Sequence, residues 1–419
     1  MKITFILACL LVPFTLHAQR ARLSPSDLET ERAFVETCTR AAAEQTELML
    51  RAVGEPTGRN YPRTMSNNGR LVTTGMYDWT PGFFPGSLWY LYELTGETKW
   101  RDQAKRWTET LAPLQTFTGH HDLGFMMYCS YGNAERLAPD TTYNPILVRS
   151  AQSLATRFSP RTQTIKSWNR RKAWNDTTTW YYPVIIDNMM NLEMLFYASR
   201  VSGDKRYYDI ARQHAETTMR NHFRKDFTTY HVVDYDTLSG RVLHRATCQG
   251  YSDNSTWARG QAWAIYGYTM TYRETRDPRF LRVAEKATAA YLRRLPSDLV
   301  PRWDFNAGMK GYRPEGSSYA VRFPGTELRD ASAAAIVCSA LFELGELTGK
   351  RRYTRLAIEM LHSLASPAYT ARPGTNADFL LTHCVGSIPH ENEIDKPLVY
   401  ADYYYLEALC RYKRSLEAE

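Results

Sequence analysis

Apolar and polar positions along this chain follow the spacing of amphipathic helices that come in pairs. Four segments share one pattern, in which an apolar run ends at a turn containing Gly or Asp and a second run follows. Each second run carries an aromatic residue with an alanine four positions later, so both lie on one helix face. The four pairs are Trp100/Ala104, Tyr207/Ala211, Phe280/Ala284 and Tyr353/Ala357. The pattern therefore predicts a repeated helical hairpin.

The spacing of the repeats predicts how many hairpins the chain forms. The last three alanines follow at equal intervals, and the longer gap before them leaves room for one more hairpin, supplied by residues 146–158. Residues 28–53 add an outer helix, and the inner helices are expected to begin near 82, 122, 187, 258, 330 and 402. Six inner and six outer helices with almost no strand predict an all-α (α/α)6 toroid. An open helical solenoid is the alternative.

The long connections all precede inner helices. They are rich in Gly, Pro, Thr, Tyr and Trp and cover residues 54–81, 223–257, 298–329 and 369–401. Within them, His231–Leu243 is typical of a small β-hairpin. In a closed ring these loops gather at one mouth, where we expect a site.

Residues 1–18 have the pattern of a secretory signal peptide. Lys2 precedes a short apolar run that closes at Ala18, and the run is too short to span a bilayer comfortably. We therefore expect removal of residues 1–18, a single domain over residues 19–419, and export to the periplasm or the exterior. No other segment of the sequence looks like a membrane span.

Composition narrows the class of partner. Hydrophobic residues make up 43% and charged residues 23% of the 419 residues, which excludes wholesale disorder. The net charge of +8 suits an anionic substrate, but no dense Lys/Arg stripe suggests nucleic acid. A solvated loop explains the most basic stretch, 161–171, equally well. The six cysteines beyond residue 18 form no CxxC pair and read as buried small hydrophobes rather than a disulfide scaffold.

Aspartates stand at the start of several inner helices, namely Asp78, Asp122, Asp187, Asp330 and Asp402. Helix capping is the ordinary explanation for any one of them. Asp187 differs because it lies in an apolar run, where it must be desolvated or satisfied by partners such as Asn188 and Asn191. Desolvation raises a carboxyl pKa, as a general acid near neutral pH requires. Asp122 lies one hairpin earlier, and two carboxylates in one pore indicate sugar chemistry.

A third cluster runs from Gln249 to Trp263. Trp257 and Trp263 flank Arg259, and aromatic rings can stack on sugars while arginine pairs with a carboxylate. Core tryptophans with a structural arginine ion pair explain the same residues equally well. His120 and His121 have no third ligand at sensible spacing, so we expect no metal. The absence of G-x-G-x-x-G and P-loop patterns argues against a nucleotide cofactor.

Together these stretches resemble glycoside hydrolase family 88, the unsaturated glucuronyl hydrolases. The resemblance covers nearly the whole chain in order, through DWTPGFFPGSLW (78–89), HDLGF (121–125), IIDNMMNL (185–192), WARGQAWAIYG (257–267) and DYYYLEAL (402–409). It implies an (α/α)6 fold, in agreement with the hairpin count. It also implies removal of a 4,5-unsaturated uronic acid from the non-reducing end of oligosaccharides made by polysaccharide lyases. An unsaturated rhamnogalacturonyl hydrolase and a non-catalytic binder of acidic oligosaccharides are the alternatives.

The resemblance assigns roles to particular residues. It makes Asp187 the general acid/base and Asp122 a second essential acid, with no cofactor. It implies substrate contacts from His231, Gln249, Trp257, Arg259, Trp263 and Trp79, although His231 also reads as a loop hydrogen-bonder. The stretch 174–180 is longer than the family pattern, and Gly386-Ser387 is a candidate for the family's C-terminal serine contact. The parent polysaccharide, sulfate preference and aglycone residues are therefore left open.

Overall fold

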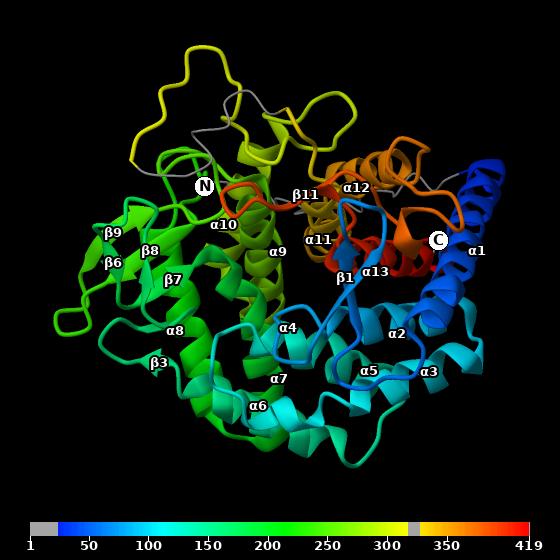
Figure 1. Ribbon diagram of the computed structural model, residues 1–419, viewed down its shortest axis with the longest axis horizontal. Coiled ribbons are helices and arrows are strands. Elements are labelled where there is room, and N and C mark those ends of the chain that lie inside the picture. Colours follow the sequence, from blue (N-terminus) through cyan, green and yellow to red (C-terminus); the bar gives the residue numbers. More distant parts are fainter. Residues whose placement is uncertain (1–23, 317–326, 419) are drawn as a thin grey trace, which may run out of the picture.

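The computed structural model describes residues 24–316 and 327–418. The predicted signal peptide at 1–18 and part of the predicted mouth loop 298–329 lie outside the described residues. In Figure 1 the chain runs once around the molecule from blue to red, which brings α13 back beside α2. This contact closes the ring, so the predicted (α/α)6 toroid is confirmed and the open solenoid is wrong.

The inner ring consists of helices that are apolar on most sides. It is formed by α2 (Phe83–Thr95), α4 (Leu123–Met127), α7 (Leu192–Ser202), α9 (Ala258–Thr275), α11 (Ala331–Thr348) and α13 (Val399–Glu417). The second of these continues through a π-helical segment, η2 (Tyr128–Gly132), and α5 (Asn133–Leu137), while a 3₁₀ segment, η3 (Ile186–Asn191), leads into α7. Because neighbours cover these helices all round, their sequences show apolar runs rather than narrow stripes.

The outer ring consists of more strongly amphipathic helices. Its members are α1 (Pro25–Val53), α3 (Thr98–Glu109), α6 (Tyr143–Ala155), α8 (Lys205–Asn221), α10 (Pro278–Leu292) and α12 (Arg351–Leu364). The aromatic and alanine of each predicted pair are all buried. The alanine lets the outer helix approach the inner ring, while the aromatic fills the space beside it. Two short 3₁₀ turns, η1 (Ala112–Thr116) and η5 (Asn376–Asp378), complete the helical elements.

Short antiparallel strand pairs lie within the connections, and most of them were not predicted from the sequence. Their strands are β1 (Tyr61–Met65), β2 (Leu71–Thr74), β3 (Phe158–Ser159), β4 (Thr164–Ile165), β5 (Arg171–Lys172), β6 (Thr179–Trp180), β7 (Pro183–Ile185), β8 (Val232–Tyr235), β9 (Val242–Ala246), β10 (Cys384–Ser387) and β11 (Asn392–Lys396). The strands pair as β1–β2, β3–β4, β5–β6, β7–β8–β9 and β10–β11. The hairpin expected at 231–243 is present as β8–β9. Strands of two to five residues are too short to give a periodic signal.

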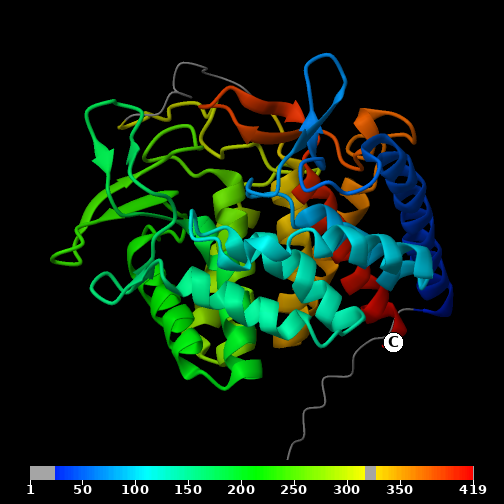
Figure 2. The same ribbon diagram turned by 60° about the horizontal axis from the view of Figure 1, so that its bottom comes forward.

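The long connections gather at one end of the barrel. Figure 2 shows the blue β1–β2 hairpin and the red β10–β11 hairpin together above the helices, with the green hairpins on the same side. Backbone bridges join Thr64 to Leu398 and Trp257 to Asp304, so loops far apart in sequence are tied to one another. This end is therefore the mouth that the sequence predicted.

Two further findings concern the core. The six cysteines of the described residues are free, and all but Cys38 are buried, as expected for small hydrophobes. Among the described helices, only α11 is long and apolar enough to cross a membrane. However, 83% of that stretch is buried inside the protein.

Candidate active site

The local fold around Asp187 places its carboxyl at the inner end of the mouth. Strand β7 pairs with β8 through Ile185 and Val232, and the amide of Ile186 donates to the carbonyl of His231 at 3.0 Å. The chain then turns into η3, where Asp187 is the second residue. The sheet therefore brings Asp187 and His231 together from positions far apart in the sequence.

The Asp187 carboxyl is buried, with 8% of the residue exposed. The indole of Trp263 and the residue's own amide donate hydrogen bonds to it, but its Oδ2 atom has no hydrogen-bond partner among the described residues. Burial, reinforced by the nearby negative charge of Asp122, raises the pKa of Asp187 to about 7. Asn188 and Asn191, the partners expected from sequence, bind other groups. Asp187 thus holds an exchangeable proton near neutral pH.

His231 faces the unpartnered oxygen of Asp187. Its Nδ1 accepts hydrogen bonds of 3.1 Å from the amides of Cys248 and Gln249, so the ring proton is on Nε2. That Nε2 lies 3.6 Å from Asp187 Oδ2 and is itself buried without a partner. Burial holds the pKa of His231 well below its usual range, which keeps the ring neutral. Two unpartnered polar atoms facing each other are typical of a site that a ligand completes.

Two histidines flank the second acid. His121 Nε2 and His120 Nδ1 each lie 3.2 Å from an oxygen of Asp122. Burial alone would raise the pKa of Asp122, but the adjacent histidines outweigh it and hold the pKa below its ordinary value. Asp122 is therefore ionised beside a protonated Asp187. From sequence, these histidines were weighed only as metal ligands. Their effect on the pKa of Asp122 was not predicted, although both adjoin Asp122 in the chain.

A close helix contact brings the two acids to the same pore. Any Cβ at Gly124 would lie 2.5 Å from the Cα of Asn191, so only glycine allows α4 and η3 to approach this closely. The Asn191 side chain then accepts a hydrogen bond of 2.9 Å from the Phe125 amide. This contact explains how Asp122 reaches Asp187 from the adjacent inner helix.

Arg259 has a protein partner, as the structural alternative predicts. Only 1% of the residue is exposed, and its Nη1 atom lies 2.8 Å from Asp330 Oδ2. Its Nη2 atom donates to the carbonyl of Gly386 at 2.5 Å. The guanidinium therefore does not project freely into the mouth, and a direct contact with a substrate carboxylate stays a prediction. Its charge nevertheless acts on Asp187 and opposes the rise in that pKa.

The predicted aromatic residues differ in how much of each ring is free. Trp257 and Trp263 are almost fully buried, as the core alternative expects. Trp257 packs on the His231 ring at 4.6 Å, and the Arg259 guanidinium lies 4.4 Å from the Trp257 ring centre. Trp79 is only partly buried and contacts the ring of Tyr400 at 4.9 Å. Among these three, Trp79 offers the most ring surface for stacking.

Gln249 connects two mouth loops. Its amide binds His231, and its side-chain nitrogen donates to the carbonyl of Gly386 at 3.2 Å. The residue is partly exposed, so its side chain is at the edge of the site. All eight residues predicted from sequence therefore lie in one connected cluster. Among the described residues, no group of three or more His, Cys, Asp or Glu is arranged to hold a metal.

Helix capping, the ordinary explanation for the aspartates, holds for Asp330 but not for the acid pair. Asp330 caps α11 by accepting from the Ser332 amide, whereas Asp122 and Asp187 make no such bond. Asp402 lies within α13 and accepts from two loop amides at 2.9 Å. Asp330 and Asp402 thus bind backbone amides in structural roles, whereas Asp122 and Asp187 cap no helix.

The charge of Asp122 leads to a prediction about pH. In Asp122→Asn the like charge is gone, so the pKa of Asp187 falls below about 7. A general acid, the role that the sequence predicts for Asp187, works in its protonated form. Activity should therefore be lost as pH rises through that pKa, and the alkaline limb of kcat/KM should move down by on the order of one pH unit. Profiles of kcat/KM against pH test this. Asp102→Asn, on exposed α3, is the control and should leave the limb in place. If the alkaline limb of Asp122→Asn stays in place, the Asp122 charge does not raise the pKa of the acid that limits activity.

An (α/α)6 toroid with a protonated and an ionised carboxyl at its mouth defines a class of protein, the toroidal glycoside hydrolases. The sequence model of Glycosyl Hydrolase Family 88 matches residues 59–342. The chain belongs to this family and is a glycosidase, so the resemblance seen in the sequence is confirmed.

Several unsaturated glucuronyl or chondroitin disaccharide hydrolases are similar to most of the chain. An unsaturated glucuronyl hydrolase of Formosa agariphila is 46% identical over 364 residues, 86% of each chain. An unsaturated chondroitin disaccharide hydrolase of Streptococcus pyogenes is 31% identical and covers 84% of this chain and 86% of its own length. A crystal structure of an unsaturated glucuronyl hydrolase specific for heparin has a TM-score of 0.83 at 43% identity, covering 92% of this chain and 98% of that one. These relatives confirm the predicted unsaturated glucuronyl hydrolase function.

Proposed function

We propose that this enzyme removes 4,5-unsaturated glucuronic acid from the non-reducing end of lyase-generated oligosaccharides, with Asp187 as the proton donor and acceptor. The observation that carries the proposal is the pair of unpartnered atoms, Asp187 Oδ2 and His231 Nε2, that face each other at 3.6 Å. With a pKa of about 7, Asp187 is protonated in a large fraction of molecules at neutral pH. A carboxyl in this state can give a proton and take one back within a single turnover.

The chemistry follows from the substrate's enol ether. Asp187 donates its proton to C4, and the C4=C5 electrons form the new C–H bond, leaving an oxocarbenium-like cation at C5 that the ring oxygen stabilises. A water molecule adds at C5 and returns a proton to Asp187. The resulting hemiketal opens, and the glycosidic bond then breaks without attack at C1. The usual relation between carboxylate separation and stereochemical outcome does not apply, because it assumes displacement at C1.

The surrounding groups support this cycle electrostatically. Ionised Asp122 keeps the proton on Asp187 until the substrate arrives, and it favours the positive charge that develops in the sugar ring. Neutral His231 offers its Nε2 proton to a substrate oxygen. Arg259 lies behind the site, and although it is paired with Asp330, its charge still opposes the rise in the pKa of Asp187.

A substrate panel tests the proposed activity. The C4=C5 bond conjugated to the carboxylate absorbs in the ultraviolet, and hydration removes that absorbance. We expect loss of absorbance with unsaturated disaccharides from heparin or chondroitin, because a hydrolase specific for heparin and an unsaturated chondroitin disaccharide hydrolase are both similar to this chain. Hyaluronan, ulvan and pectin disaccharides complete the panel. Turnover of the pectin product alone would favour the rhamnogalacturonyl alternative, and binding without turnover would favour a non-catalytic binder.

Export is a second part of the proposal. The apolar run at residues 1–18 supports cleavage after Ala18 and delivery to the periplasm or the exterior. We expect the enzyme isolated from its native cells to have an intact mass that lacks those residues. An intact mass that includes them would contradict the proposed processing.

A further inference from the structure

A second cavity occupies the far half of the barrel, away from the mouth. Its volume is about 630 Å³, and its walls come from inner elements α2, η2, α5, α7, α9 and α13. Phe125 and Tyr404 line this cavity, and both contact Trp263, which donates to Asp187. Trp263, with Phe125 and Tyr404 beside it, therefore separates the candidate active site from this cavity. A volume of this size is in the range of small-molecule sites.

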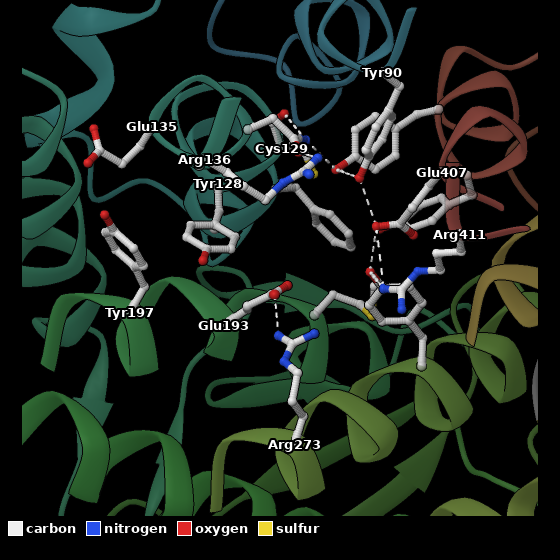
Figure 3. Close-up of a pocket in the computed structure, with 18 of the residues that line it drawn as sticks. Tyr90, Tyr128, Cys129, Glu135, Arg136, Glu193, Tyr197, Arg273, Glu407 and Arg411 are labelled. Atoms are coloured by element: carbon white, nitrogen blue, oxygen red, sulfur yellow. Dashed lines mark hydrogen bonds and ion pairs between the residues drawn. The ribbon is translucent and has the colours of Figure 1, made fainter. Parts of the chain in front are cut away.

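The arginines on the wall are all neutralised by glutamates, and Glu135 is the one lining glutamate that has no ion pair among the described residues. The five lining arginines each pair with a glutamate: Arg136 and Arg414 with Glu93, Arg200 with Glu274, Arg273 with Glu193 and Glu343, and Arg411 with Glu343 and Glu407. Figure 3 shows several of these groups converging from opposite sides of the cavity. An anion would have to compete with these ion pairs and would also meet the carboxylate of Glu135, so the wall does not favour an anionic guest.

Part of the wall is fixed before any guest arrives. Glu407 accepts hydrogen bonds from the hydroxyls of Tyr90, Tyr266 and Ser339 at 2.6 to 2.9 Å. Because Glu407 and its three partners come from four different inner helices, the network fixes the relative positions of those helices. A preorganised wall lowers the entropic cost of binding a small guest.

Other polar groups on the wall have no partner. The hydroxyls of Tyr128 and Tyr404 make no hydrogen bond with the described residues, although Tyr404 is only 2% exposed. Glu135 Oε1 accepts from Asn144, but its Oε2 is buried and unpartnered. In Figure 3 Tyr128, Glu135 and Glu193 lie around the same side of the cavity. Buried polar atoms are normally hydrogen-bonded, so the unpartnered Glu135 Oε2, together with the two tyrosine hydroxyls that have no protein partner, indicates a polar guest.

The backbone beside Tyr128 is also unusual. Tyr128 begins the π-helical segment η2, which interrupts the second inner helix where it borders the cavity. π-Helical turns are rare and occur frequently at functional sites. The turn places Tyr128 and Cys129 on the wall and is consistent with a site selected for binding.

We propose that this cavity binds a small neutral polyhydroxylated molecule, the size of one or two sugar rings. Tyrosine rings supply flat apolar faces for such a ring, and the unpartnered hydroxyls and carboxylate oxygens bind its hydroxyl groups. The site is separate from the mouth and does not depend on the proposed activity.

Calorimetry tests this second site while the mouth is occupied. The Asp187→Asn variant is first saturated with an unsaturated chondroitin disaccharide and then titrated with glucose, rhamnose, N-acetylglucosamine or myo-inositol. We expect saturable binding of at least one probe. Tyr128→Phe and Glu135→Gln, built in the same background, should bind it roughly fivefold more weakly, which is the loss of one hydrogen bond. Trp79→Phe, at the mouth, should bind the probe with unchanged affinity.

Both cavity variants should fold normally, because Tyr128→Phe removes a hydroxyl with no protein partner and Glu135→Gln keeps the acceptor for Asn144. Their thermal unfolding, measured beside the parent, checks this. The proposal is overturned if no probe binds, or if both variants bind the probe as tightly as the parent. It is also overturned if only Trp79→Phe weakens binding.

Discussion

Replacing Asp187 with asparagine should reduce kcat/KM by at least about 10³-fold, because asparagine can neither donate a proton to C4 nor accept one from water. The side chains have nearly the same shape, so the hydrogen bond from Trp263 and the position of His231 should persist. Substrate affinity should therefore change little compared with the loss of turnover.

The same substitution has a defined effect on stability. The folded pKa of Asp187, about 7, lies above its ordinary value of 3.8, so ionising this carboxyl costs folding free energy as pH rises between those values. Asparagine carries no charge and avoids that cost. At pH above 7 the variant should resist urea at least as well as the parent enzyme.

Three measurements separate a chemical role from a structural one. Ultraviolet absorbance follows turnover, calorimetry follows disaccharide binding, and urea unfolding follows stability. Asp102→Asn should match the parent in all three, because that carboxylate is exposed on α3. Near-normal turnover in Asp187→Asn would refute the assignment. Loss of turnover together with unfolding at low urea would indicate that Asp187 maintains the fold instead.

The ring of helices could be predicted because its packing repeats. An aromatic residue and an alanine four positions apart, such as Phe280 and Ala284, must meet the same kind of inner neighbour in each hairpin, so the pattern recurs in sequence. The short mouth strands have no such repeat. Most of them pair within local hairpins of two to five residues per strand, which give no periodic signal, and bridges such as Thr64 with Leu398 join them to distant parts of the chain.

Eight candidate residues could be named from the sequence, but only one of them, Asp187, carried an internal conflict that indicated an altered pKa. Asp187 stands in an apolar run, and that conflict alone pointed to an unusual carboxyl. The contacts of His120 and His121 with Asp122 were not predicted, because three adjacent polar residues are also typical of an ordinary loop. The pairing of Asp330 with Arg259 joins positions 71 residues apart on neighbouring inner helices, and no local pattern encodes such a pair.

The Arg259–Asp330 pair combines two functions in one carboxylate. Asp330 neutralises a guanidinium that is 1% exposed, and its other oxygen caps α11 through Ser332. Val385 and Gly386 supply carbonyl acceptors to the same guanidinium, so the pair also anchors the β10–β11 hairpin at the mouth. A buried ion pair of this kind adds little net stability compared with apolar residues, yet removing one partner leaves a charge without compensation.

We therefore expect Asp330→Asn to lower the free energy of unfolding by about 3–5 kcal/mol, because Arg259 is left buried without its counter-ion. Asparagine remains a good helix cap, so loss of capping explains little of that change. Asp277→Asn is the matched control, since Asp277 caps α10 by accepting from Arg279 at an exposed position. It should change stability by less than about 1 kcal/mol. Urea unfolding of both variants tests this prediction. Equal small losses of unfolding free energy would show that Asp330 acts only as a helix cap.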